Sequence, residues 1–179
     1  MKSKFVEVEI KARISDKDSL LETIGKKYRF VREYRKHDTY FLCRTAEGVR
    51  NIRIRRDDSG CLITFKRKSV TDGIEVNDEW ETGVKDFETA RSLLEYLGCE
   101  YHYEKTKNGY LHTDGTVSIE LSEVNDLGWF LELEYMADRT EQGSIQKGEA
   151  AVRVVLADLG ISERDIEPRY YADLILNRS

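Results

Sequence analysis

Like-charged residues two positions apart recur along this sequence. The acidic pairs are Glu7/Glu9, Glu79/Glu81 and Glu132/Glu134, and the basic pairs are Arg53/Arg55, Lys66/Lys68 and Lys105/Lys107. In a β-strand, residues i and i+2 point to the same face, so each pair would place two like charges side by side. Clustered carboxylates suit a divalent cation, whereas clustered ammonium and guanidinium groups suit a polyanion. A metal-bound chain of phosphates satisfies both sets, and the pattern therefore predicts a polyphosphate–metal site.

The simpler interpretation of any one pair is the solvated face of an ordinary antiparallel sheet. Two observations favour an interior position when the strands are taken together. Like charges side by side repel, which makes whole strands of one sign unusual on a solvated face. The expected helices also carry apolar residues that need a docking surface. They would cover the apolar side of the sheet and leave its charged side facing inward.

Alternation and turn signals predict the elements that position these charges. We expect helices around residues 19–25, 87–97 and 142–159 and a short one after Pro168, with Asp16 or Asp18 capping the first. The expected strands cover residues 5–14, 28–43, 49–56, 61–70, 75–84, 100–112, 116–123 and 128–136.

The chain has the signs of an internal duplication. The segment Ser-Leu-Leu-Glu-x-x-Gly occurs at residues 19–25 and again at 92–98, each time after a Glu-x-Glu strand and before three strands. We expect one domain over residues 1–179, with pseudo-repeats at about 5–70 and 75–136 and C-terminal helices in 141–179. The fold class is α+β: a closed, mostly antiparallel eight-stranded β-barrel with helices packed outside, because closure removes the sheet edges.

Composition excludes several classes of protein. Of 179 residues 35% are charged, yet the net charge is −5, which argues against a nucleic-acid coat. No apolar run is long enough for a membrane span, and the first residues lack the apolar stretch of a secretory signal. The cysteines, Cys43, Cys61 and Cys99, are widely spaced, so we expect neither a disulfide framework nor a zinc site, and a reducing cytoplasm as the location.

The order of motifs resembles the CYTH superfamily, the triphosphate tunnel metalloenzymes. Glu7-Val8-Glu9-Ile10-Lys11 is similar to the family's Glu-x-Glu-x-Lys signature, and the similarity extends over nearly the whole chain. The other motifs that carry it are Ile52-Arg53-Ile54-Arg55, Phe65-Lys66-Arg67-Lys68, Glu79-Trp80-Glu81, Glu104-Lys105-Thr106-Lys107, Val124-x-x-Leu127-Gly128-x-Phe130-x-Glu132-x-Glu134 and Tyr170-Tyr171-x-x-Leu174. The last resembles the family's closing helix, although core packing explains it equally well.

The resemblance implies a role for each residue at a matching position. Mg²⁺ or Mn²⁺ would be held by Glu9, Glu132 and Glu134, with support from Glu7, Glu81 and Glu120. The triphosphate would be bound by Lys11, Arg53, Arg55, Lys66, Lys68, Lys105 and Lys107. Of these, Glu9, Lys11, Arg53 and Lys66 are the expected catalytic residues.

Two positions depart from the family pattern. Ser122 stands where the family often has Asp. Glu120 is two residues earlier, should face inward as Ser122 does, and could replace that carboxylate. Lys107 stands where Arg is usual, which removes a two-pronged phosphate contact. The sequence shows no candidate for a general base. His37 is interpreted as an ordinary histidine at the end of a strand.

The resemblance implies a phosphoryl-transfer enzyme acting on a small triphosphate. The cyclase-type branch is the closest in pattern, with ATP converted to cyclic AMP and pyrophosphate. The alternatives are a triphosphatase acting on thiamine triphosphate, inorganic triphosphate or a nucleoside triphosphate, and a binding module without turnover. No nucleic-acid or membrane partner is expected, and the resemblance makes a homodimer plausible.

Overall fold

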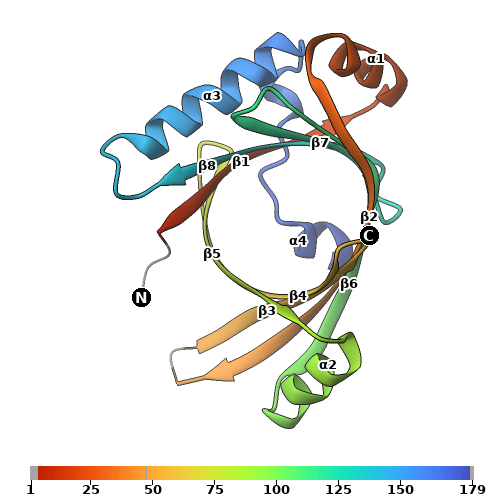
Figure 1. The fold of residues 1–179 in the computed structure, drawn as a ribbon, viewed down its shortest axis with the longest axis vertical. Coiled ribbons are helices and arrows are strands. Elements are labelled where there is room, and N and C mark those ends of the chain that lie inside the picture. Colours follow the sequence, from red (N-terminus) through yellow and green to blue (C-terminus); the bar gives the residue numbers. More distant parts are fainter. Residues whose placement is uncertain (1–3, 47, 178–179) are drawn as a thin grey trace.

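A computed structural model shows a closed barrel of eight antiparallel strands with helices on its outside (Figure 1). It describes residues 4–46 and 48–177, so the outermost residues of the domain expected over 1–179 lie outside the described part. In chain order the elements are β1 (Phe5–Ile14), α1 (Lys17–Lys27), β2 (Arg29–Thr45), β3 (Gly48–Asp57), β4 (Gly60–Thr71), β5 (Ile74–Val84), α2 (Phe87–Tyr96), β6 (Glu100–Thr113), β7 (Val117–Val124), β8 (Trp129–Asp138), α3 (Ser144–Asp158), the 3₁₀ helix η1 (Glu163–Asp165) and α4 (Tyr171–Leu176).

The barrel closes in the order β1-β5-β4-β3-β2-β6-β7-β8, with β8 returning to β1. Each half of the chain supplies a strand, a helix and three strands, which confirms the expected fold class and its duplicated halves. Figure 1 looks through the ring of strands, with α1, α2 and α3 outside it and the short α4 seen within the ring.

Strand β1 shows why charged alternation leads to this architecture. Its apolar residues Val6, Val8 and Ile10 are fully buried in the main core, which also includes apolar side chains of α1 and α3. The intervening acidic residues of the strand point to the opposite face, toward the barrel interior. Both faces of β1 are therefore covered, one by helices and the other by the barrel itself.

Individual residues determine where α1 begins and how closely α3 packs against the sheet. The Asp16 carboxylate accepts a hydrogen bond from Ser19 N at 3.1 Å and caps α1, as the sequence predicts. Gly148 lets α3 lie close to β8, because a Cβ atom there would come within 2.6 Å of the Tyr135 ring. None of the helices in the described ranges has the length and apolar composition needed to span a membrane.

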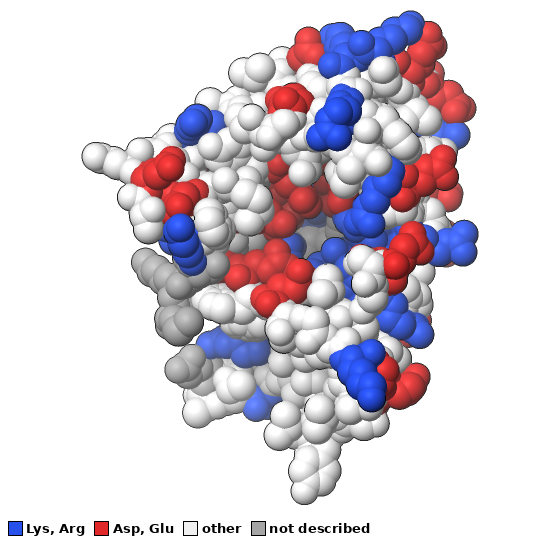
Figure 2. Space-filling view, in the orientation of Figure 1, with Lys and Arg blue, Asp and Glu red and all other residues white. Residues whose placement is uncertain are grey.

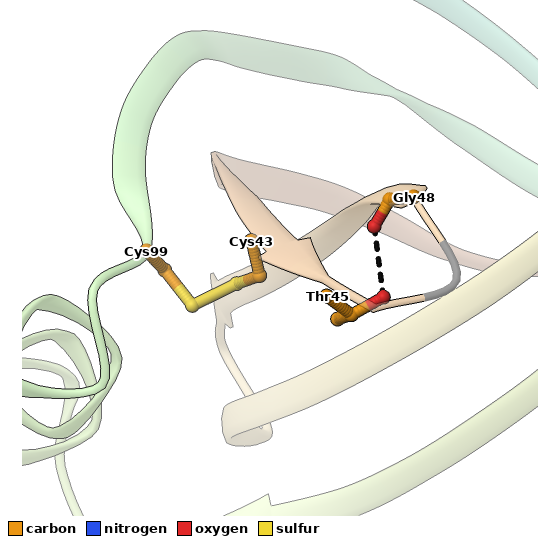
Figure 3. Close-up of a disulfide and its surroundings, with 4 residues drawn as sticks. All are labelled: Cys43, Thr45, Gly48 and Cys99. Carbon is orange, nitrogen blue, oxygen red and sulfur yellow. Dashed lines mark hydrogen bonds between the residues drawn. A yellow bond between two sulfur atoms is a disulfide. The ribbon is translucent and has the colours of Figure 1, made fainter.

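The structure contains a disulfide between Cys43 and Cys99, and the expectation drawn from cysteine spacing was wrong for this pair (Figure 3). The two residues are 56 positions apart in sequence, but β2 and β6 are neighbours and Leu42 pairs with Glu100. The next pair in that register is Cys43 with Cys99, at the point where β6 begins. Spatial neighbours created by strand pairing are invisible to linear spacing. The cytoplasmic location stays a prediction.

Candidate active site

A cavity of about 780 Å³ lies where the inward-facing charged residues of the strands meet. Figure 2 shows a hollow with acidic side chains gathered along one side and basic side chains along the other and within it. The site residues expected from the sequence all line this cavity except Lys11, which lies behind Tyr171 with Nζ 4.6 Å from the ring centroid. The strand parity thus places the two sets of charge in one compartment.

The register of β1 and β8 brings Glu9, Glu132 and Glu134 together. Glu9 lies directly opposite Glu134, and Glu132 is two residues earlier on the same face of β8. One carboxylate oxygen from each residue lies within 4.8 Å of the other two. Three converging carboxylates are the hard oxygen ligands that Mg²⁺ or Mn²⁺ prefers, so this trio fits a divalent cation.

The electrostatics of the trio support the same interpretation. Burial, together with the neighbouring carboxylates Glu75 and Glu132, raises the pKa of Glu9 to about 7. Burial and three nearby glutamates hold the pKa of Glu134 well above its ordinary value. Glu132 is the exception: burial would raise its pKa, but the ammonium groups of Lys107 and Lys105 outweigh burial and lower it. A bound cation would relieve the repulsion among the three.

The remaining acidic candidates contact cations of the protein, as Glu132 of the trio also does through Lys107. Glu7 accepts a hydrogen bond from Lys66 Nζ at 2.6 Å. Glu81 accepts from the Thr64 hydroxyl at 2.8 Å and lies 3.4 Å from Arg53 Nη2. Each therefore orients a basic side chain in this structure and lies outside the trio.

Glu120 is also held by protein groups. Its carboxylate accepts hydrogen bonds from Lys36 Nζ and the Tyr34 hydroxyl, and Lys107 Nζ lies 3.7 Å away. Burial alone would raise its pKa, but Lys36 and Lys107 bring the pKa down to about 2. Ser122, the position that departs from the family pattern, is fully buried next to Phe130 in the register. In this structure Glu120 is bound by Lys36 and Tyr34 and is not part of the carboxylate trio of Glu9, Glu132 and Glu134.

Asp38 organises the basic wall of the cavity. It is fully buried, and its two oxygens accept from Arg55 Nε at 2.7 Å and Nη2 at 2.9 Å. Lys105 Nζ lies 3.3 Å from the same carboxylate. Burial would raise the pKa of Asp38, but Lys105 and Arg55 outweigh it and hold the pKa well below the usual range. One anionic side chain thus fixes two of the expected phosphate-binding groups side by side.

Tyr40 is a candidate proton acceptor that sequence reasoning missed. It lines the cavity from β2 and stacks on Tyr103, with ring centroids 4.3 Å apart. Burial alone would raise its pKa, but the charges of Lys105, Arg53 and Lys68 together outweigh burial and lower the phenol pKa below its ordinary value of 10. The phenolate form of Tyr40 is therefore reached at a lower pH than that of an ordinary tyrosine, which makes Tyr40 a candidate proton acceptor.

The C-terminal segment reaches into the site. The Tyr171 hydroxyl donates a hydrogen bond to Glu132, and its ring centroid lies 4.9 Å from Lys105 Nζ and 5.4 Å from Lys107 Nζ. Lys11 Nζ in turn donates to the Arg169 carbonyl at 2.7 Å. Residues near Tyr171 therefore form one wall of the cavity.

Several inward-facing polar residues that contact the candidate site were missed by sequence reasoning, and they share one signal. The inward-facing residues of β2 alternate in the same way as the recognised motifs, but they mix charge types and so form no like-charged pair. The missed residues are Tyr34, Lys36, Asp38 and Tyr40 on β2, and Glu75 and Asn77 on β5. Extending the two-residue alternation of the recognised motifs along these strands would have identified them.

Comparisons with known proteins agree with this geometry. A protein of Methanocaldococcus jannaschii, named as a candidate adenylate cyclase, is 27% identical over 174 residues, covering 94% of this chain and 98% of that protein. A conserved hypothetical protein of Pyrococcus furiosus has a solved structure that matches with a TM-score of 0.80 at 27% identity, covering 94% of this chain and 99% of its own.

A more distant structure shares the fold. The Hippeastrum protein HpAC1, described as an adenylyl cyclase candidate with a dominant triphosphatase activity, matches with a TM-score of 0.59 at 18% identity, over 97% of each chain. The profile of the CYTH domain matches residues 6–171, which include every strand of the barrel except the first residue of β1. The chain belongs to the CYTH domain family.

Proposed function

We propose that this chain is a metal-dependent phosphoryl-transfer enzyme that acts on a small triphosphate, with ATP as substrate and cyclic AMP and pyrophosphate as products. One observation carries the proposal: a carboxylate trio suited to a divalent cation and a wall of arginine and lysine suited to a polyanion line the same cavity. A pure anion-binding protein would have no use for the trio.

Metal binding is assigned to Glu9, Glu132 and Glu134. CYTH proteins are metal-dependent, and the trio is the acidic cluster that the described residues place inside the barrel. The ion, when bound, neutralises charge on the phosphate oxygens. Mg²⁺ and Mn²⁺ are both consistent with three carboxylate ligands.

Phosphate binding is assigned to the cations of the opposite wall. Arg53 is hydrogen-bonded to Thr64 at 3.0 Å and paired with Glu79 at 3.1 Å, which fixes its guanidinium toward the cavity. The other groups are Arg55, Lys66, Lys68, Lys105 and Lys107, which all line the cavity. Because their carboxylate partners already hold them in place, little conformational freedom is lost when phosphate oxygens arrive.

In the cyclisation reaction, the ribose 3′ oxygen attacks the α-phosphorus and the bond from that phosphorus to the β-phosphate oxygen breaks. The hydroxyl proton passes to Tyr40 as phenolate, and the arginine and lysine wall takes up the charge of the departing pyrophosphate. Product release then returns the proton from Tyr40 to solvent.

A second candidate is triphosphate hydrolysis, and the similarity to the Hippeastrum protein favours it because that protein is described as having a dominant triphosphatase activity. Water would attack the terminal phosphorus, the bond from that phosphorus to its bridging oxygen would break, and the diphosphate portion would leave while the terminal phosphate is released as orthophosphate. Candidate substrates are thiamine triphosphate, inorganic triphosphate and nucleoside triphosphates. The same residues serve both reactions, since they differ in which phosphorus faces the attacking oxygen.

The deciding experiment incubates the protein separately with ATP, thiamine triphosphate and tripolyphosphate, each with Mg²⁺ and with Mn²⁺, and separates the products by chromatography. Cyclic AMP with pyrophosphate supports the first proposal, and orthophosphate supports the second. Calorimetric titration with tripolyphosphate covers the case without turnover. Binding without any product identifies a capture module, and the absence of both binding and product contradicts the proposed site.

A further inference from the structure

Glu167 connects the C-terminal segment to the end of β1 through a closed set of contacts. Its backbone N–H donates to the Lys11 carbonyl at 2.8 Å. Its carboxylate accepts from Arg13 Nε at 2.8 Å on β1. The same carboxylate accepts from Arg169 Nε at 2.8 Å and Nη2 at 2.7 Å, and from the Arg169 backbone N–H at 3.2 Å. Glu167 itself is only 6% exposed.

These contacts lie outside the cavity, but the segment that they hold continues to residues that line it. Arg169, held by Glu167, presents its carbonyl to Lys11 Nζ at 2.7 Å, and two residues later Tyr171 places its hydroxyl on Glu132. Ile166 forms an isolated bridge with Ala12, so residues 166–171 follow the end of β1 before turning inward. The segment is too short and irregular to hold that path through helix or strand pairing of its own.

Electrostatics make this anchor strong at neutral pH. Hydrogen bonds from Arg169, followed by those from Arg13, bring the pKa of Glu167 to about 2. The carboxylate therefore stays ionised, and charged hydrogen bonds from two guanidinium groups converge on it. Replacing it with an uncharged amide would weaken all of these bonds at once.

Resting on the proposed metal-dependent triphosphate chemistry, we propose that Glu167 is a positioning residue of the active site. It fastens residues 167–171 to β1 and thereby holds the Tyr171 hydroxyl on Glu132 and the Arg169 carbonyl on Lys11. Tyr171 is then an outer partner that orients a metal-binding carboxylate, a type of contact whose loss commonly lowers metal affinity by roughly 10- to 100-fold. Glu167 controls that contact from outside the cavity.

The first test needs no substrate or metal. Lys11 is 2% exposed and covered by Arg169 and Tyr171, so it should resist acetylation by acetic anhydride in the native protein. Glu167→Gln should raise the acetylation rate of Lys11 at least severalfold, as measured by peptide mass mapping. Glu167→Asp, which keeps the charge, should restore most of the protection and covers the case in which the amide variant does not fold.

Glu163→Gln is the matched control. Glu163 belongs to the same C-terminal stretch and binds Arg153 at 2.5 and 2.7 Å, but it ties η1 to α3 and not to β1. If Glu167 serves only general docking of the C-terminus, both variants should expose Lys11 equally, and the positioning role is refuted. Exposure of Lys11 in Glu167→Gln alone supports it.

The second test measures Mg²⁺ and Mn²⁺ affinity by calorimetry in a double-mutant cycle. Glu167→Gln and Tyr171→Phe should each weaken metal binding by roughly tenfold, and the double variant should be little weaker than either one. Additive losses, or unchanged affinity in Glu167→Gln, would refute action through Tyr171. A wild-type protein that binds no metal contradicts the proposed function itself, while the acetylation result still decides the path of the C-terminal segment.

Discussion

Replacing Glu9 by glutamine should stabilise the metal-free protein while destroying its metal site. Burial and the neighbouring carboxylates raise the pKa of Glu9 from an ordinary 4.5 to about 7 in the folded state. Between these two pH values the unfolded chain has lost the Glu9 proton and the folded protein still holds it. The contribution of Glu9 to the free energy of unfolding therefore falls as pH rises from 4.5 to about 7 and then levels off. Glutamine carries no such proton and escapes the loss.

The magnitude follows from the interval between the two pKa values. At about 1.4 kcal/mol per pH unit, the change from 4.5 to about 7 corresponds to roughly 3 kcal/mol. The wild type and Glu9→Gln should have similar stabilities near pH 5, and the variant should be more stable by up to roughly 3 kcal/mol at pH 8. Both proteins must be kept in EDTA, because a bound cation would offset the repulsion among the carboxylates of the wild type and stabilise it.

Glu75→Gln provides a matched control with the opposite sign. Glu75 lies directly opposite Glu9 in the pairing of β1 and β5 and is also buried. Burial would raise its pKa, but Lys68 and Lys11 outweigh burial and lower it. Its charged form therefore stabilises the fold above its ordinary pKa of 4.5, and Glu75→Gln should be less stable than the wild type at pH 8.

The assay is urea unfolding monitored by tryptophan fluorescence at pH 5, 6, 7 and 8 in EDTA, followed by thermal melts with and without 10 mM MgCl₂ (about the concentration needed for a weak site). Mg²⁺ should raise the Tm of the wild type and leave that of Glu9→Gln unchanged, and turnover should be lost in the variant. If Glu9→Gln is no more stable than the wild type at pH 8, the repulsion argument for the trio is wrong.

Three further changes test other parts of the structure. Tyr40→Phe should lower kcat by roughly 100-fold or more while tripolyphosphate binding, measured by calorimetry, is retained; equal loss of both would argue for a purely structural role. Gly148→Ala should cost roughly 1–3 kcal/mol in urea unfolding, because the new methyl group would meet the Tyr135 ring at 2.6 Å, and an unchanged midpoint would show that α3 can shift freely. In the double variant Cys43→Ser with Cys99→Ser, the free energy of unfolding should fall by up to about 4 kcal/mol, because the disulfide no longer restricts a loop of 56-residue separation in the unfolded chain. A stability equal to that of the oxidised protein would mean that the disulfide contributes nothing.

The barrel and its charged interior could be predicted because they depend on strand parity. Val8 between Glu7 and Glu9 already separates a helix-covered face from an interior face, and the same alternation recurs on β3, β4, β5, β6 and β8. The Asp16 cap was equally local, since it needs only a short polar side chain before a helix.

The parts that could not be predicted depend on geometry across strands or on irregular backbone. Sequence shows that Glu7 and Glu120 face inward, but only the structure shows that Lys66 and Lys36 reach them. The inward turn of residues 166–171 has no periodic pattern, because individual contacts from Glu167 hold it. The disulfide required knowledge of which strands are neighbours.

The closure of the barrel through β1 also bears on when the proposed metal site can form during synthesis. β1 pairs with β8, so the first and last strands of the barrel must meet before the ring is complete. Such distant pairing is a slow, non-local step of folding. Glu9 lies on one side of that seam and Glu132 and Glu134 lie on the other. A chain still emerging from the ribosome cannot assemble the proposed metal site until residue 134 is available, and metal binding by a refolding sample should report the moment at which the seam closes.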